Sequence, residues 1–231
     1  MTMPTRLREV GDLERSDHFH LPADARCYFW GEYTPYNLTG GQRWEYSSTN
    51  RLIANFKKKK EREGLPEWRY KLIAIQQVAE QFSKFWNWAE LHQRKVALIP
   101  IPPSKARTDP LYDPRMEQML AQLAAQVRLP LDSRACLSFS GVHAASHATE
   151  ARPTPDELYD ELQFDAVIGR PDLPPPMIFL FDDMLTSGAH YRAVTRKLGE
   201  VFPGVPVIGN FIARRIVPNP FDDFEDLEDA M

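Results

Sequence analysis

Two adjacent carboxylates are followed closely by two hydroxyls and a glycine in this 231-residue chain. Asp182 and Asp183 come directly after an apolar run, Met177–Phe181, and Thr186-Ser187-Gly188 follow two residues later. Backbone N–H groups at a helix start, together with hydroxyls, can hold a phosphate, and a glycine lets the backbone approach it closely. Carboxylates would repel that phosphate unless they face hydroxyl groups or a metal ion. The segment therefore predicts a site for a phosphorylated sugar bound with Mg²⁺.

Each of these features also has an ordinary structural explanation. Carboxylates often end a strand or cap a helix, and a Thr-Ser-Gly sequence is common in turns. We base the ligand-site prediction on the combination of an apolar run, Asp182-Asp183 and Thr186–Ala189 within one segment.

The elements around this segment alternate between short apolar strands and amphipathic helices. We expect strands at 27–33, 96–101, 135–139, 177–181 and 205–213, helices at 47–60, 68–89, 115–127 and 187–202, and a short helix opened by a capping box at Thr154–Glu157. In the helix at 68–89 the expected core face comprises Leu72, Ile75, Val78, Phe82, Phe85 and Trp86. This alternation predicts an α/β fold with a mainly parallel central sheet flanked by helices. Ligands in such folds bind beyond the carboxyl ends of the strands, which is where the Asp-Asp segment would lie.

Composition divides the chain into three parts. Residues 1–25 are polar, without clear periodicity, and indicate an N-terminal extension or docking arm; residues 26–216 form the α/β domain; residues 217–231 form an acidic C-terminal tail. In the tail, Phe221, Phe224 and Leu227 are interspersed with acids. We interpret it either as a docking peptide for a basic, apolar groove on a partner or second protomer, or as a disordered, solubilising tail.

Overall composition excludes several classes of protein. The formal net charge of −4 provides no global basic field and argues against direct nucleic-acid binding. The longest apolar runs fall far below the roughly 20 residues that a membrane-spanning helix needs, so we expect no membrane association. Cys27 and Cys136 form no CxxC pair or disulfide framework, and the first residues lack the apolar core of a signal peptide. We therefore expect a cytoplasmic protein with reduced thiols.

The segment Phe179–His190 resembles the phosphoribosyl-pyrophosphate (PRPP) signature of type I phosphoribosyltransferases, and the nearest branch is the ComF-like group of predicted amidophosphoribosyltransferases. Val96–Pro103 is similar to the strand before the family's pyrophosphate loop, and Ser104–Arg115 to that loop and the following helix start. Asn50–Lys60 resembles the ComF stretch before the first long helix, and Val207–Arg215 the closing strand. The resemblance implies a type I phosphoribosyltransferase-like fold with a mobile hood loop at Gly141–Arg152.

The resemblance also implies an activity: transfer of the 5-phosphoribosyl group from PRPP to an unidentified small-molecule nucleophile, with release of pyrophosphate. Asp182 and Asp183 would be the catalytic residues that hold the ribose 2′- and 3′-hydroxyls. Mg²⁺ would arrive on the substrate, so we expect no metal-ligand set in the protein. The implied 5′-phosphate-binding residues are Thr186, Ser187, Gly188, Ala189 and His190. The implied pyrophosphate-binding residues are Ser104, Lys105, Arg107, Arg115 and Arg152, although any one of the first four can equally be an ordinary surface residue.

The sequence departs from the family pattern in three ways. His190 stands where the phosphate loop usually has Thr or Ser, Tyr112-Asp113-Pro114-Arg115 replaces the usual Arg-Gly-Phe-Asn-Gln, and the zinc ribbon is missing. Two alternatives follow: a catalytically weak PRPP- or nucleotide-binding regulatory module, or an effector subunit of a bacterial defence complex. The arm or the acidic tail would then contact a protein partner or a second protomer. We interpret the basic run Lys57–Lys60 as a solvated helix end.

Overall fold

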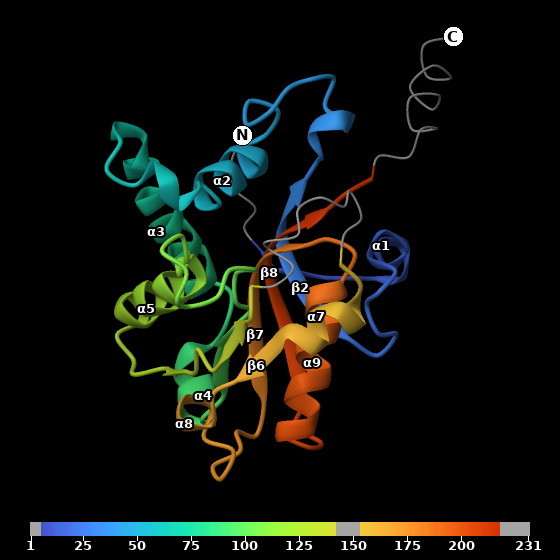
Figure 1. Cartoon of the computed structure of the whole chain (residues 1–231), viewed down its shortest axis with the longest axis vertical. Helices are drawn as coiled ribbons and strands as arrows, with labels where there is room; N and C mark the ends of the chain where they lie inside the picture. The colour runs from blue at the N-terminus through green and yellow to red at the C-terminus, as the bar shows by residue number, and fades with distance from the viewer. Residues whose placement is uncertain (1–5, 142–152, 218–231) are drawn as a thin grey trace.

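The computed structural model describes residues 6–141 and 153–217 and centres on a six-stranded sheet (Figure 1). Its strands are β1 (Arg8–Glu9), β2 (Arg26–Tyr33), β3 (Ala97–Pro100), β4 (Asp132–Ser133), β7 (Ile178–Leu185) and β8 (Val207–Arg215). They lie in the order β1-β2-β8-β7-β3-β4, and every neighbouring pair is parallel except β1 with β2. The predicted α/β fold with a mainly parallel sheet is thus confirmed. Arg152, the predicted hood loop after Gly141, and the acidic tail after Val217 lie outside the described residues.

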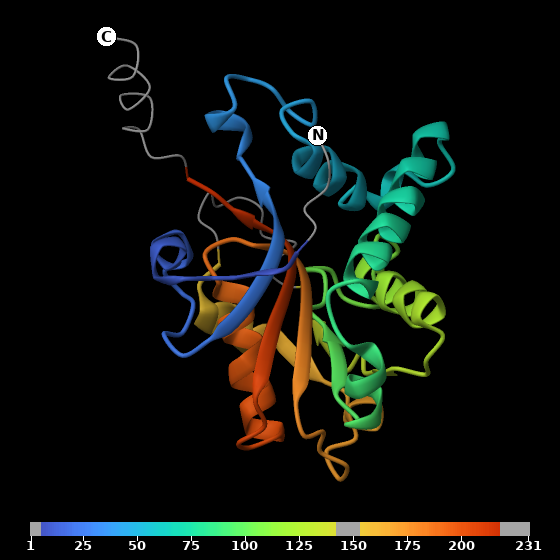
Figure 2. The ribbon, with the colours of Figure 1, turned by 180° about the vertical axis from the view of Figure 1, so that it is seen from behind.

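Helices cover both faces of this sheet (Figures 1 and 2). The α-helices are α1 (Asp12–Arg15), α2 (Ser48–Phe56), α3 (Arg69–Ser83), α4 (Trp88–Gln93), α5 (Arg115–Val127), α7 (Pro155–Glu161), α8 (Ala166–Gly169) and α9 (Ala189–Val201), and short 3-10 helices occur at Ser16–His18, Tyr36–Leu38, Lys60–Arg62 and Pro66–Trp68. On one face α2, α3 and α5 pack around Trp30, Phe82 and Phe181. On the other, α7 and α9 pack around Leu180 and Phe211. Within the described residues, no helix combines the length and apolarity needed to cross a membrane.

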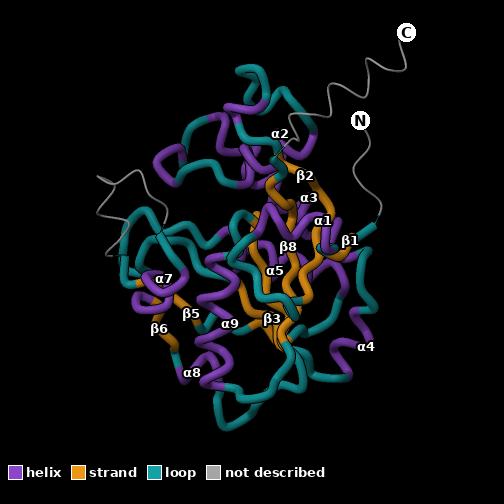
Figure 3. The backbone as a smooth tube through the Cα atoms, turned by 90° about the vertical axis from the view of Figure 1, so that its right-hand side faces the viewer, coloured by secondary structure: helices purple, strands orange, loops and turns teal. Residues whose placement is uncertain are grey.

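Several local predictions were wrong in their boundaries. The helix expected at 68–89 is interrupted after Ser83, and α4 starts anew where the Asn87 side chain accepts the N–H of Glu90. Leu72, expected in the core, is 50% exposed. The strand expected at 135–139 is β5 (Leu137–Phe139), which pairs with β6 (Leu162–Phe164) beside α7 and away from the main sheet (Figure 3). The predicted capping box at Thr154 and Glu157 is confirmed.

The described part of the N-terminal segment packs onto the domain. Strand β1 extends the sheet, with Arg8 opposite Phe29, and Val10 is buried. The Arg15 guanidinium donates to the carbonyl oxygens of Pro22 and Ala25 at 2.9 and 2.7 Å, which fixes the return of the chain into β2. This segment therefore belongs to the folded body, and its position places it against the loop after β7.

The chain connections create a switch point between two neighbouring strands. From β3 the chain passes through α5 to β4, and from β7 it passes through α9 to β8. Since α5 and α9 lie on opposite faces, the loops after β3 and β7 separate at the carboxyl edge of the sheet. Such a point forms the crevice in which open α/β folds bind ligands. The Asp182-Asp183 segment lies next to this point. The strand was expected to end at Phe181, but β7 continues to Leu185, so both acids lie within the last half of the strand and not beyond its end.

A glycine in β8 determines how closely α9 can pack on the sheet. A Cβ at Gly209 would lie 2.8 Å from Cys27 Sγ and 2.9 Å from the Tyr191 ring. We therefore expect Gly209→Ala to lower the free energy of unfolding by about 1–3 kcal/mol, measured by chemical denaturation. The control is Gly199→Ala on exposed α9 surface, where a Cβ meets nothing and should raise that free energy by about 0.5–1 kcal/mol. Equal stability of Gly209→Ala and the wild type would contradict this packing argument.

Candidate functional site

A buried carboxylate, Asp183, forms the centre of the site. It is 3% exposed and accepts from Lys57 Nζ at 3.0 Å and from Arg115 Nε and Nη2 at 2.9 and 2.6 Å. Lys57 comes from the end of α2 and Arg115 from the first position of α5, so two helices on one face meet β7 here. Burial alone would raise the pKa of Asp183, but the Lys57 ammonium and the Arg115 guanidinium outweigh it and lower that pKa below its ordinary value.

The ion pairs continue beneath Asp183 into the protein. Arg115 Nη1 also donates to Asp113 Oδ2 at 3.0 Å, and the same oxygen accepts from Lys71 Nζ at 2.8 Å. Lys71 is 1% exposed and donates further to the carbonyl oxygens of Phe56 and Lys58 at 2.9 and 2.8 Å. Burial lowers the pKa of Lys71, and Asp113 only partly offsets this effect. Lys71, Asp113, Arg115, Asp183 and Lys57 thus form one continuous polar network, which we call the buried ion network.

Asp182 has a different environment although it is adjacent in sequence. It is partly exposed, and its one hydrogen bond among the described residues comes from the N–H of Asp183, at 2.7 Å. Burial, followed by the nearby negative charge of Asp183, raises the pKa of Asp182 to about 7. Side chains of consecutive strand residues leave the sheet on opposite faces, which explains why the cations of α2 and α5 reach only Asp183. Asp182 therefore remains available to bind a ligand hydroxyl.

The loop after β7 presents backbone N–H groups at the start of α9. Gly188 is the N-cap residue, with φ +87°, and no side chain of the described residues caps the helix. The first N–H groups of a helix have no partner within it, so they can bind an anion. Thr186 and Ser187 are partly exposed and add two hydroxyls. The predicted phosphate-binding loop is therefore brought together with Asp182 at one edge of the sheet.

The N-terminal segment holds this loop from behind. His18 Nδ1 donates to the Thr186 carbonyl oxygen, and the His20 N–H donates to the Ser187 carbonyl oxygen at 2.8 Å. In a planar trans peptide the N–H points away from the C=O, so these contacts direct the N–H groups of Ser187 and Gly188 to the opposite side. A Cβ at Gly188 would lie 2.9 Å from the backbone N of Leu21. The close contact and the positive φ both require glycine at this position.

His190 occupies the position where the family resemblance expects a hydroxyl residue. Burial lowers the pKa of His190 to about 4, so the ring is neutral at physiological pH. The ring lies edge-to-face with Phe139, with 5.8 Å between centroids. A neutral imidazole can offer one N–H to an anion but contributes no charge to its binding.

The structure separates the predicted pyrophosphate-binding residues. Arg115 lies in the site, where Asp183 and Asp113 hold it. Lys105 instead pairs with Asp109 at 3.1 Å, Arg107 pairs with Glu117 at 3.1 Å, and Ser104 is exposed. Of the four, only Arg115 contacts one of the two carboxylates, since Lys105 and Arg107 have other acidic partners and Ser104 is exposed. Arg152 lies outside the described residues.

Three residues of the site were missed or misread from the sequence. Lys57, interpreted as part of a solvated basic run, contacts Asp183 while its ammonium stays partly exposed. Lys71 was not predicted, because the other inward positions of its helix are apolar. His18 was not predicted, because its segment has no periodicity. A local signal existed only for Lys57, which directly follows the apolar positions of α2.

Comparisons with known proteins give no match, either among protein-family models or among curated proteins. Within the residues the structure describes, no group of three or more His, Cys, Asp or Glu side chains could hold a metal ion. We therefore infer function from the geometry of Asp182, the loop after β7 and the buried ion network.

The raised pKa of Asp182 makes the stability of the fold depend on pH. In the unfolded chain the Asp182 carboxyl loses its proton near pH 3.8, whereas in the folded state it keeps this proton up to about pH 7. The free energy of unfolding therefore falls as the pH rises between these two values. The Asp182→Asn substitution removes this loss of stability with rising pH. Because Asp182 is only partly buried, we expect the variant to be about 1–2 kcal/mol more stable than the wild type at pH 8. Thermal unfolding between pH 5 and pH 8 measures the difference, which should shrink toward pH 5. A constant difference would contradict the assignment.

The buried ion network should contribute strongly to stability. Lys71→Met leaves Asp113 and two carbonyl oxygens short of a donor in a buried place, so we expect the free energy of unfolding to fall by about 3 kcal/mol. The control is Lys84→Met, which removes an exposed pair with Glu80 and should change that free energy by less than about 1 kcal/mol. Similar unfolding midpoints for the two variants in a denaturant titration would refute a structural role for the network.

Proposed function

We propose that the chain is a phosphoribosyltransferase that uses PRPP with Mg²⁺ and transfers the 5-phosphoribosyl group to a small nucleophile. The observation that supports this proposal is the placement of Asp182 beside the anion-binding start of α9 at the switch point of the sheet. A carboxylate that can accept hydroxyl groups next to a phosphate cradle suits a ribose 5-phosphate. The finer fold assignment, type I phosphoribosyltransferase-like with a hood loop at Gly141–Arg152, belongs to the same proposal.

In the proposed mechanism each part of the site has a separate task. The N–H groups at Ser187–Ala189 and the Thr186 and Ser187 hydroxyls bind the 5′-phosphate, while Asp182 accepts the ribose hydroxyls. The C1′–O bond to pyrophosphate breaks and pyrophosphate takes the electron pair. The nucleophile forms the new bond at C1′ and releases its proton to solvent. The negative charge of Asp182 stabilises the positive charge that develops on the ribose.

The site also offers positive charge of the kind that an anionic leaving group needs. Lys57 has one described partner, Asp183, and its ammonium is partly exposed, so two of its N–H bonds remain for an anion. The donor set fits Mg²⁺ carried on the substrate, since Asp182 offers one partly exposed carboxylate and Asp183 is already held by two cations. When bound, Mg²⁺ neutralises the pyrophosphate and so improves it as a leaving group.

A second candidate, a PRPP- or nucleotide-binding module without turnover, is favoured by one observation. Lys105 and Arg107, which the resemblance places on the pyrophosphate side, are directed to Asp109 and Glu117. A site that lacks these cations would bind ribose 5-phosphate groups but stabilise the departing pyrophosphate less. The two candidates differ in pyrophosphate release, not in binding.

The test of the proposal is calorimetric titration of PRPP with Mg²⁺ at pH 8, followed by a pyrophosphate-release assay with a panel of acceptors. We expect Asp182→Asn to weaken PRPP binding about tenfold or more, because a charged hydrogen bond to the ribose is lost. Ser187→Ala should weaken it severalfold through the phosphate. Asp172→Asn, an exposed acid in the connector that precedes the amino end of β7, is the matched control and should bind as the wild type does.

Two outcomes would count against the proposal. A folded wild type that does not bind PRPP excludes the transferase and a PRPP-binding module, and unchanged binding by Asp182→Asn excludes the assigned site. Binding without pyrophosphate release across the panel selects the second candidate.

A further inference from the structure

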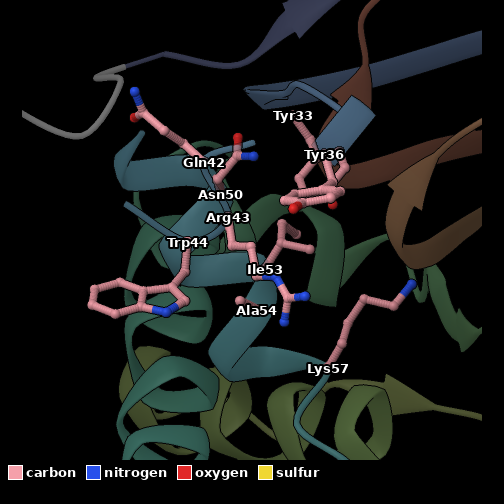
Figure 4. Close-up of a pocket in the computed structure, with 9 residues that line it drawn as sticks. All are labelled: Tyr33, Tyr36, Gln42, Arg43, Trp44, Asn50, Ile53, Ala54 and Lys57. Atoms are coloured by element: carbon pink, nitrogen blue, oxygen red, sulfur yellow. The ribbon is translucent and has the colours of Figure 1, made fainter. Parts of the chain in front are cut away.

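A cavity of about 440 Å³ lies next to the candidate site and was not predicted from the sequence. It lies between the end of β2, the segment 34–47 and helix α2, at the carboxyl edge of the sheet (Figure 4). Lys57 lines it and also donates to Asp183 Oδ1 at 3.0 Å, so the cavity adjoins the buried ion network. Its volume lies within the roughly 300–1,000 Å³ of small-molecule sites.

The walls of this cavity are fixed at both ends of the segment that forms them. The Asn50 side chain donates to the Thr34 carbonyl oxygen at 2.8 Å and accepts the Thr34 N–H at 3.3 Å. At the other end, Ser47 caps α2 by accepting the N–H of Asn50 at 3.0 Å. Ser47 Oγ also donates to Asn50 Oδ1 at 2.9 Å, and Asn50 is 3% exposed, so one buried side chain contacts both ends of the loop. The cavity is therefore formed before any ligand arrives.

The lining of the cavity combines aromatic rings with unneutralised positive charge. Tyr33, Tyr36 and Trp44 supply the rings, and Tyr36 and Trp44 are 51% and 49% exposed. The Arg43 guanidinium lies 5.2 Å from the centroid of the Tyr36 ring and has no acidic partner among the described residues. Of the described lining residues, none is acidic, and Figure 4 shows the Arg43 guanidinium at the centre of the labelled side chains, with Lys57 at their edge.

We propose that this cavity binds a planar aromatic ligand that carries a negative charge. Exposed rings beside a guanidinium favour a flat ligand that stacks on them, and the positive lining favours an anionic group at its edge. Its identification as the acceptor of the phosphoribosyl group rests on the function proposed above.

The experiment is calorimetric titration of the full chain with 1-naphthoate, a flat aromatic anion. Cyclohexanecarboxylate tests the need for a flat ring, and 1-naphthylmethylammonium tests the need for negative charge. We expect 1-naphthoate to bind at least about tenfold more tightly than either. Trp44→Leu and Arg43→Gln should each weaken its binding about fivefold or more. Arg94→Gln, which removes an exposed cation paired with Glu90 on α4, is the control and should leave binding unchanged.

Titration of PRPP into the same variants separates this inference from the proposed function. Binding of 1-naphthoate that depends on Arg43 and Trp44 supports the cavity site, whether or not PRPP binds. If the wild type binds PRPP but binds 1-naphthoate no better than cyclohexanecarboxylate, the inference about the cavity is overturned and the proposed function still stands. Equal loss of 1-naphthoate binding in Arg94→Gln and Arg43→Gln would also overturn it.

Discussion

The geometry of the site depends on the placement of one buried carboxylate. Asp183 is 3% exposed, and an ionised group there is tolerated only with partners of opposite charge. Lys57 and Arg115 supply them from the ends of two different helices, so α2 and α5 must meet β7 at this point. Arg115 in turn requires Asp113, and Asp113 requires Lys71. The loop after β3, the start of α5 and the end of α2 are therefore fixed relative to the carboxylates by charge as well as by packing.

The same constraint explains the contrast between two neighbouring acids. Both carboxylates belong to one strand, yet the pKa of Asp183 lies below its ordinary value and that of Asp182 rises to about 7. Strand geometry sends the side chains to opposite faces, and only one face carries the cations. A pair of this kind divides structural and ligand-binding tasks between two residues of the same type. Two chemically identical side chains thus acquire different proton affinities from their surroundings alone.

How much of this was predictable from the sequence depends on whether the determining contacts are local. Strand β7, the start of α9 and the capping box at Thr154 follow from patterns within a few residues, and all were predicted. The partners of Asp183 are 68 residues away or more in sequence, and no local pattern pairs Lys57 or Arg115 with it. Likewise, the cavity at Tyr36 and Trp44 depends on a loop that only tertiary contacts hold in place. The fold class was therefore predictable, and the charge network and the cavity were not.

The order of strands in the sheet has a consequence for how the chain folds during synthesis. Strand β2 is made early, but its parallel neighbour β8 is the last described strand to leave the ribosome, with Tyr28 opposite Asn210. Until then the inner edges of β2 and β7 have no partner, and they expose unpaired N–H and C=O groups. Pairing across so long a stretch of chain is slow, because the entropy of closing the loop is lost before the contacts form. The nascent chain thus carries an incomplete sheet whose central position is filled last, which is the stage at which such proteins depend most on protection from aggregation.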